Sequence, residues 1–195
     1  MKTLIAIPAL QQIYTATVQH LMNLRLVGDC ETKFAIGYQV DHARNLLAEY
    51  ALNNDFDRIL WIDSDMTFSP DLLERLSEDL KDWDAVTGLY FKRMFPTEPV
   101  IYKRVSTAPL AEPYLDYPQD TIFPIKGCGF GGILMKTDLL KDMTEPPFTP
   151  FPNVSEDLSF CLRMKGKLAC DSRVKLGHIG LSVYSEQLYI HPNGG

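Results

Sequence analysis

Two carboxylates, one residue apart, directly follow a strongly apolar run. The run Ile59-Leu60-Trp61-Ile62 ends at Asp63, and Asp65 comes after a single serine. Such a run predicts a fully buried strand, and ligand crevices form outside the carboxyl ends of the strands in a parallel sheet. Carboxylate oxygens at that edge can hold a divalent cation that also binds a pyrophosphate. The segment therefore makes Asp63 and Asp65 candidates for cation binding.

The Asp-x-Asp motif is weak on its own. It recurs at Asp55-Phe56-Asp57 and at Asp82-Trp83-Asp84, which illustrates the false-positive risk of a short motif. Only the copy at Asp63 follows a run buried enough to be a central strand. Capping of a turn is the alternative explanation for Asp63 and Asp65. We favour the cation site, because two acids this close would repel each other and a cation relieves that repulsion.

A second acidic pair opens a predicted helix. Ser155 is placed to cap this helix, and Glu156 and Asp157 fall in its first turn. Acids in a first turn interact favourably with the helix dipole, and taken alone this structural explanation is the stronger. The functional hypothesis is that Asp157 or Glu156 is a general base that removes the proton of an attacking hydroxyl.

One histidine stands out among the four. His178 follows a strand predicted over residues 172–176 and lies between Gly177 and Gly180, which let the backbone approach a ligand closely. A lone histidine is more often structural. Its position after a strand, downstream of the acidic helix, makes His178 a candidate metal ligand.

A glycine-rich segment covers residues 127–132. It satisfies G-x-G-x-x-G formally, but it lies two thirds along the chain and precedes a strand, whereas a dinucleotide fingerprint follows the first strand. We therefore expect Gly129 and Gly131 to let the backbone pass close to a bound sugar or acceptor.

Arg44 is the basic residue most suited to an anion. It lies beside Asn45 in the first turn of a predicted helix, where a guanidinium suits phosphate or nucleotide oxygens. Arg44 and Asn45 are therefore predicted to bind the nucleotide. The pairs Lys92-Arg93 and Lys103-Arg104 are interpreted as solvated surface charge.

Apolar periodicity supplies the elements that must position these residues. In the first half, strands are predicted over 3–8, 33–39 and 58–62. A helix is predicted after each strand. The first has an apolar stripe through Tyr14, Val18, Leu21 and Met22. The second is capped by Asp41, and the third begins at Ser69-Pro70-Asp71. This alternation indicates an α/β fold: a Rossmann-like, mostly parallel mixed sheet flanked by helices.

The second half is less regular. Strands are predicted over 84–91, 100–104 and 133–136, a loop over 106–119, and helices over 137–143 and from Ser155 to near Gly166. We expect one domain over 1–195, with a nucleotide-binding half at 1–90 and an acceptor or catalytic half at 91–180. Residues 181–195 are expected to be a tail or a lid.

Composition narrows the class of protein. The chain has 195 residues, and 46% of them are hydrophobic, a composition that indicates a globular domain. No apolar run approaches the roughly 20 residues of a membrane span. Its net charge of -6 does not favour a nucleic acid acceptor, although it does not exclude one. Four cysteines without a CxxC pair indicate reduced thiols, so we expect a cytoplasmic protein.

The order of these features resembles the GT-A glycosyltransferases, in particular small family-2-like members. The resemblance is carried by Ala43-Arg44-Asn45-Leu46-Leu47, Ile59-Leu60-Trp61-Ile62-Asp63-Ser64-Asp65-Met66, the segment 127–132, Ser155-Glu156-Asp157 and Gly177-His178. It spans most of the chain, and the order is far more specific than any one motif.

The resemblance implies a hexosyltransferase that moves a sugar from a UDP- or GDP-linked donor to an acceptor hydroxyl. It implies Asp65 and His178 as ligands of Mn²⁺ or Mg²⁺, with Asp63 contacting ribose or metal, and a histidine ligand favours Mn²⁺. Asp157 would be the base of an inverting displacement. Many relatives carry further acceptor-binding regions, which this sequence lacks, so no acceptor is implied.

Two other functions remain open. The chain could be a non-catalytic sugar- or nucleotide-binding module that keeps the same scaffold, because a fold does not fix a function. A metal-dependent phosphohydrolase that uses Asp63, Asp65 and Asp157 is the second alternative. The products formed from a nucleotide-sugar separate the three hypotheses.

Overall fold

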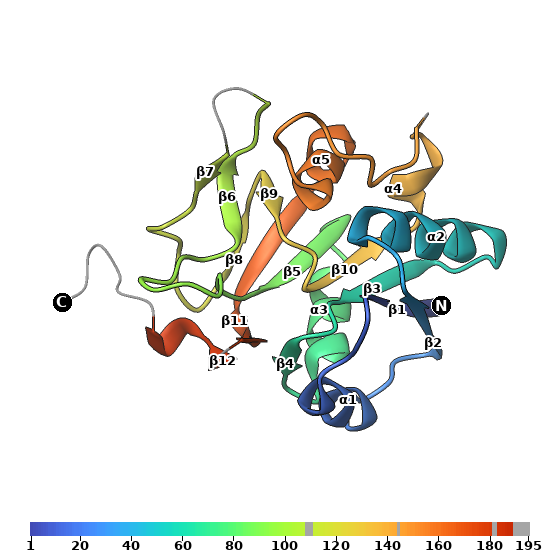
Figure 1. The fold of residues 1–195 in the computed structure, drawn as a ribbon, viewed down its shortest axis with the longest axis horizontal. Helices are drawn as coiled ribbons and strands as arrows, with labels where there is room; N and C mark the ends of the chain where they lie inside the picture. The colour runs from blue at the N-terminus through green and yellow to red at the C-terminus, as the bar shows by residue number, and fades with distance from the viewer. Residues whose placement is uncertain (108–110, 144, 181–182, 189–195) are drawn as a thin grey trace.

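A nine-stranded mixed sheet forms the centre of the protein. The computed structural model describes residues 1–107, 111–143, 145–180 and 183–188. The sheet has the order β12-β11-β5-β10-β3-β1-β2, with β4 and β8 also paired to β11, and a small sheet β7-β6-β9 lies beside it (Figure 1). The elements are β1 (Lys2–Ala9), α1 (Thr15–Met22), β2 (Asp29–Ile36), α2 (Val40–Asn53), β3 (Arg58–Ile62), β4 (Met66–Phe68), α3 (Leu72–Asp79), β5 (Ala85–Leu89), β6 (Ile101–Arg104), β7 (Glu112–Pro113), β8 (Ile122–Pro124), β9 (Gly127–Cys128), β10 (Gly132–Lys136), α4 (Asp138–Lys141), α5 (Glu156–Arg163), β11 (Leu168–Ile179), β12 (Val183–Tyr184) and a 3-10 turn (Glu186–Leu188).

The central strands run mostly in one direction. β1 is parallel to β2 and to β3, and β5 is parallel to β11. β10 lies between β3 and β5 and is antiparallel to both, so β2, β1, β3, β5 and β11 share one direction. This confirms the predicted mostly parallel mixed sheet flanked by helices.

Alternating residues of the strands build a core on each face of the sheet. β3 has the predicted bounds, and all five of its residues are buried. Ile59 and Trp61 pack with residues of α2, α4 and α5, whereas Leu60 and Ile62 pack with residues of α3. The period of two along a strand sends successive side chains to opposite faces. Helices therefore cover both faces (Figure 1).

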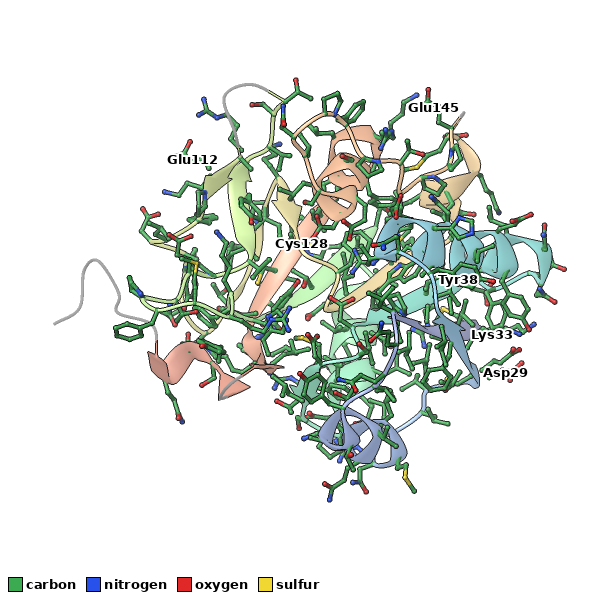
Figure 2. All side chains as sticks on the ribbon, viewed as in Figure 1. Asp29, Lys33, Tyr38, Glu112, Cys128 and Glu145 are labelled. Atoms are coloured by element: carbon green, nitrogen blue, oxygen red, sulfur yellow. The ribbon has the colours of Figure 1, made fainter. Side chains whose placement is uncertain are left out.

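The second strand lies earlier in the chain than expected. β2 covers Asp29–Ile36 and not 33–39, because it pairs with β1 in register from Lys2↔Asp29 onward. β2 is the edge of the sheet, so its side chains are mostly solvated and its apolar pattern is weak. Phe34 and Ile36 are exposed. Asp29 and Lys33 project from this rim (Figure 2).

The expected apolar face of the first helix is partly wrong. Met22 is 82% exposed, and Tyr14 precedes α1 and is exposed as well. The side chain that α1 buries is Thr17. α1 packs against β4, with the rings of His20 and Phe68 5.5 Å apart, and Leu21 of the predicted stripe packs partly buried against the core, so the prediction is wrong for Tyr14 and Met22.

Two helices begin at other residues than predicted. α2 has Gln39 at its N-cap, so Asp41 lies in the first turn and not at the cap. α3 has Asp71 at its N-cap, and Ser69 lies in a turn before it, where its carbonyl accepts a hydrogen bond from the amide of Leu72 at 3.1 Å.

The second half agrees with prediction in part, and the short strands β7, β8 and β9 were not predicted. β10, α4 and α5 lie where strand, helix and helix were expected, and Ser155 is the N-cap of α5. β5 is shorter than the predicted strand 84–91. The predicted loop 106–119 contains β7. β11 is a 12-residue strand, longer than the predicted 172–176, so His178 lies within the strand and not after it.

Most of the predicted tail 181–195 lies outside the described residues. Within it, β12 pairs with the end of β11 through His178↔Tyr184. The carboxylate of Glu186 accepts a hydrogen bond from the Tyr117 hydroxyl at 2.9 Å. In the part of the chain that the structure describes, no helix has the length and apolarity needed to cross a membrane.

Candidate functional site

One cavity lies at the edge of the sheet where β1 and β3 end. The antiparallel strand β10 begins at this same edge, and β5 ends there. The cavity has a volume of about 260 Å³. It is lined by Pro8, Ala9, Leu10, Tyr38, Val40, Arg44, Asp63, Ser64, Asp65, Arg93, Glu156, Asp157 and His178. Six of the predicted site residues thus converge from segments far apart in the sequence.

Asp65 and His178 face each other in this cavity. β4 pairs antiparallel with β11 through His178↔Met66, and the amide of Ile179 donates to the Asp65 carbonyl at 2.7 Å. This pairing brings Asp65 Oδ2 to 3.4 Å from His178 Nε2, and both side chains are 15% exposed. The other imidazole nitrogen, Nδ1, lies 3.0 Å from the Phe91 carbonyl oxygen. If Nδ1 carries the proton, Nε2 presents its lone pair to the cavity.

Arg93 is a site residue that the sequence analysis missed. It was interpreted as surface charge, but its Nη1 lies 2.8 Å from Asp65 Oδ2 and it lines the cavity. The contact depends on the fold, since the loop after β5 must return to the end of β3. The available signal was its position just beyond a predicted strand, at the same sheet edge as Asp65.

Arg44 joins the two acidic segments of the site. Its Nη2 donates to Asp63 Oδ1 at 2.8 Å, and its Nη1 donates to Glu156 Oε1 at 2.6 Å. The side chain is only 2% exposed. Burial opposes its charge, but the carboxylates of Asp63, Glu156 and Asp157 outweigh burial and raise the pKa of Arg44. Arg44 therefore stays charged and holds the end of β3 against the start of α5.

The acidic pair of α5 has perturbed carboxyl groups. Burial raises the pKa of Glu156, against the opposing charge of Arg44. Burial likewise raises the pKa of Asp157, against Arg44 and a hydrogen bond with Ser155. Asp157 Oδ1 accepts hydrogen bonds from the Ser155 hydroxyl and, at 2.7 Å, from the Leu158 amide. A carboxylate with a raised pKa at a cavity wall is suited to accept a proton.

Three predicted ligand-binding residues do not line the cavity. Asn45 Oδ1 accepts a hydrogen bond from the Phe148 amide at 2.9 Å, so this side chain holds the proline-rich loop before α5. A Cβ at Gly129 would stand 2.0 Å from the Tyr90 hydroxyl, and Gly131 also lies against Tyr90. The Gly131 carbonyl accepts a hydrogen bond from the Asp63 amide at 3.4 Å, so this segment supports the site from behind.

An aromatic residue on the far wall was also missed. Tyr38 follows β2 (Figure 2). It lines the cavity together with Leu10 and Val40. Its ring lies 5.0 Å from that of His42, in a tilted arrangement. Placing β2 too late in the chain hid this residue, because it made Tyr38 part of a strand and not of the loop beyond its end.

The donor groups fit a divalent cation only in part. Among the residues in the described ranges, no three His, Cys, Asp or Glu side chains are grouped as metal ligands. Asp65 Oδ2 and His178 Nε2 fit as a pair, because a ligating histidine usually has its other nitrogen on a carbonyl, as His178 does with Phe91. Asp63 Oδ1 is held by Arg44.

Comparison with solved structures establishes the fold. A197 from STIV is 19% identical, with a TM-score of 0.71 over 92% of this chain and 86% of that protein. GalNAc-T7, solved with UDP, GalNAc and Mn²⁺, is 9% identical, with a TM-score of 0.62 over 92% of this chain. TarS 1-349 of S. aureus, solved with UDP, is 13% identical, with a TM-score of 0.54 over 87%.

The chain has the GT-A glycosyltransferase fold. It spans 44% of the GalNAc-T7 chain and 57% of the TarS chain, so it corresponds to one part of those proteins. No protein-family model matches the sequence, and no curated protein matches it either. The predicted GT-A fold is therefore confirmed, while membership of a family-2-like group stays a prediction.

Proposed function

We propose that this protein transfers a sugar from a UDP- or GDP-linked donor to an acceptor hydroxyl, with a divalent cation at Asp65 and His178. The observation that carries the proposal is the convergence of Asp65, His178 and Asp157 on one cavity at the mouth of a GT-A sheet. Structural neighbours with bound UDP, and in one case Mn²⁺, support the class of donor.

Donor binding in this proposal uses the wall near β1 and β3. Asp63 contacts the ribose or the cation, and Arg44 holds Asp63 in place. A cation at Asp65 and His178, Mn²⁺ or Mg²⁺, supplies neutralisation of the departing diphosphate. The side chains of Tyr38 and Val40 offer an apolar surface on the same cavity.

Asp157 is the proposed base. The acceptor hydroxyl oxygen bonds to the anomeric carbon while the bond from that carbon to the diphosphate oxygen breaks, and the hydroxyl proton passes to Asp157. A base on the side of the sugar opposite the diphosphate gives inversion. The raised pKa of Asp157 suits proton acceptance, and Glu156 serves chiefly to anchor Arg44.

The test is a product assay with purified protein, Mn²⁺ or Mg²⁺, and a panel of UDP- and GDP-sugars. Release of intact nucleoside diphosphate, with transfer to an acceptor or slow hydrolysis, supports the proposal. Release of inorganic phosphate or a nucleoside monophosphate identifies a phosphohydrolase. Donor binding without turnover identifies a binding module.

The state of the cysteines bears on the proposed cellular compartment. All four cysteines are free and three are buried, which supports our proposal of a reducing, cytoplasmic compartment. The two halves, 1–90 for the nucleotide and 91–180 for the acceptor, remain the proposed division of the domain.

A further inference from the structure

Arg93 lies on a loop whose base is firmly closed. After β5 the chain turns back, and the Val100 amide donates to the Tyr90 carbonyl at 3.0 Å. The Lys92 amide donates to the Glu98 carbonyl at 2.9 Å, and Lys92 Nζ pairs with Glu98 Oε2 at 2.7 Å. These contacts hold the backbone of Arg93 at the rim of the cavity.

The guanidinium of Arg93 uses the oxygen that a cation would need. Its Nη1 lies 2.8 Å from Asp65 Oδ2, and the same oxygen lies 3.4 Å from His178 Nε2. A divalent cation bound by this oxygen would stand about 2 Å from it. Two cations against one oxygen repel each other strongly. Arg93 must therefore give up Oδ2 of Asp65 when a divalent cation binds to that oxygen.

Arg93 is able to leave. Its side chain is 46% exposed, and its stem passes over Gly180, where a Cβ would lie 3.3 Å from Arg93 Cδ. Arg44, by contrast, is buried and held by two carboxylates. Of the two arginines that line the cavity in the described part of the chain, Arg93 has the more exposed side chain, and besides Asp65 its Nη1 has one long contact, 3.5 Å to the Ile179 carbonyl oxygen.

We propose that Arg93 exchanges partners when the donor binds: it neutralises Asp65 in the ligand-free protein and moves to the donor diphosphate once a divalent cation takes Asp65. The forked guanidinium matches phosphate oxygens in geometry and charge. The inference rests on the proposed function, because the second partner of Arg93 is the diphosphate of the nucleotide.

The exchange predicts effects of opposite sign in one variant. Arg93→Gln removes the competitor of the metal, so Mn²⁺ alone should bind roughly tenfold more tightly. The same variant loses a phosphate contact, so UDP or GDP at saturating Mn²⁺ should bind roughly tenfold more weakly. A residue that only supports the loop would weaken both kinds of binding.

The experiment is isothermal titration calorimetry on the full chain, first with MnCl₂ alone and then with UDP and GDP in saturating Mn²⁺. Arg104→Gln is the matched control, because it removes the same charge from an exposed pair with Glu112 on the small sheet. It should behave as wild type in both titrations. Arg93→Lys keeps the positive charge without the forked guanidinium. It should bind Mn²⁺ about as weakly as wild type does, and it should bind the nucleotide less tightly than wild type.

The outcomes separate the two proposals. Tighter Mn²⁺ binding with weaker nucleotide binding in Arg93→Gln supports the exchange. If wild type binds UDP or GDP with Mn²⁺ through Asp65, and Arg93→Gln changes neither affinity or weakens both, the exchange is wrong, whereas the metal-linked nucleotide site of the proposed function stands. If wild type binds neither nucleotide in the presence of Mn²⁺, the proposed function fails and the exchange fails with it.

Discussion

Arg44 Nη1 and Glu156 Oε1 lie 2.6 Å apart, although 112 positions separate the two residues in the sequence. The same guanidinium donates to Asp63 Oδ1 at 2.8 Å. The buried side chain of Arg44 therefore connects the end of β3 to the first turn of α5. The metal side and the base side of the proposed site are positioned relative to each other by this contact.

Removal of Arg44 should therefore damage stability as well as function. Arg44→Met leaves Asp63 and Glu156 without their counter-charge, and losing one partner of a buried pair costs about 3 to 5 kcal/mol. Urea unfolding followed by circular dichroism measures the loss. Arg104→Met, at an exposed pair, should change the free energy of unfolding by less than about 1 kcal/mol. Equal effects of the two substitutions would contradict the bridging role.

Asp157 should affect the rate and not the affinity. Asp157→Asn keeps the shape of the side chain but removes the base, so transfer should fall by roughly a hundredfold or more. Donor affinity, measured by calorimetry, should stay close to wild type. Asp138→Asn, in the first turn of α4, is the control for loss of a first-turn acid outside the cavity, and it also loses an exposed pair with Lys141. Parallel losses of affinity and rate in Asp157→Asn would indicate a purely structural role at the start of α5.

The Gly129 position should be limited by Tyr90 and not by a ligand. Gly129→Ala places a Cβ 2.0 Å from the Tyr90 hydroxyl and 2.8 Å from Val100 Cγ1, and such overpacking destabilises by about 1 to 3 kcal/mol. Tyr90→Phe removes that hydroxyl, so the double variant should recover part of the loss. A double-mutant cycle of unfolding free energies measures the coupling. Strict additivity would show that Tyr90 is not the obstacle.

Asp79 and Asp171 form a carboxyl pair that does not line the cavity, and Asp79 should make the free energy of unfolding depend on pH. Burial, reinforced by a hydrogen bond with Asp171, raises the pKa of Asp79 to about 6 from 3.8. The folded state then binds more protons between about pH 4 and 6, so the free energy of unfolding falls as pH rises through this window.

Asp79→Asn should remove this dependence. Relative to wild type, the variant should gain on the order of 1 to 2 kcal/mol between pH 4.5 and pH 7.5, after allowance for solvent screening. Urea unfolding at the two pH values measures the gain. Asp82→Asn, an exposed acid nearby, should show no such change. A constant offset between Asp79→Asn and wild type at both pH values would contradict the assigned pKa.

Central strands were easier to predict than edge strands. β3 was predicted with its observed bounds because burial on both faces makes every residue apolar. β2 lies at the edge, with Phe34 and Ile36 exposed, so its pattern carried little information about where it pairs. β11 extends beyond the predicted 172–176 at both ends: Asp171 lies inside the strand and pairs with Arg173 at 2.7 Å, and Gly177 does not end the strand.

Residues that line the cavity were predictable as candidates where their local position marks them. Asp63, Asp65 and Asp157 stand at the end of a strand or the start of a helix, and His178 lies near the end of one. Arg93 was not predictable in this way, because its contact with Asp65 requires the loop after β5 to fold back. The burial of Arg44 was also hidden, since a helix pattern does not reveal two carboxylates that arrive from other elements.

The central claim is that Asp65 links a divalent cation to a nucleoside diphosphate. Calorimetric titration of wild type and Asp65→Asn with UDP and GDP, with and without Mn²⁺, tests it most directly. Wild type should bind one of them at least about tenfold more tightly with Mn²⁺, and Asp65→Asn should lose that difference while remaining folded. Failure of wild type to bind either nucleotide, or an equal Mn²⁺ dependence in Asp65→Asn, would contradict the account.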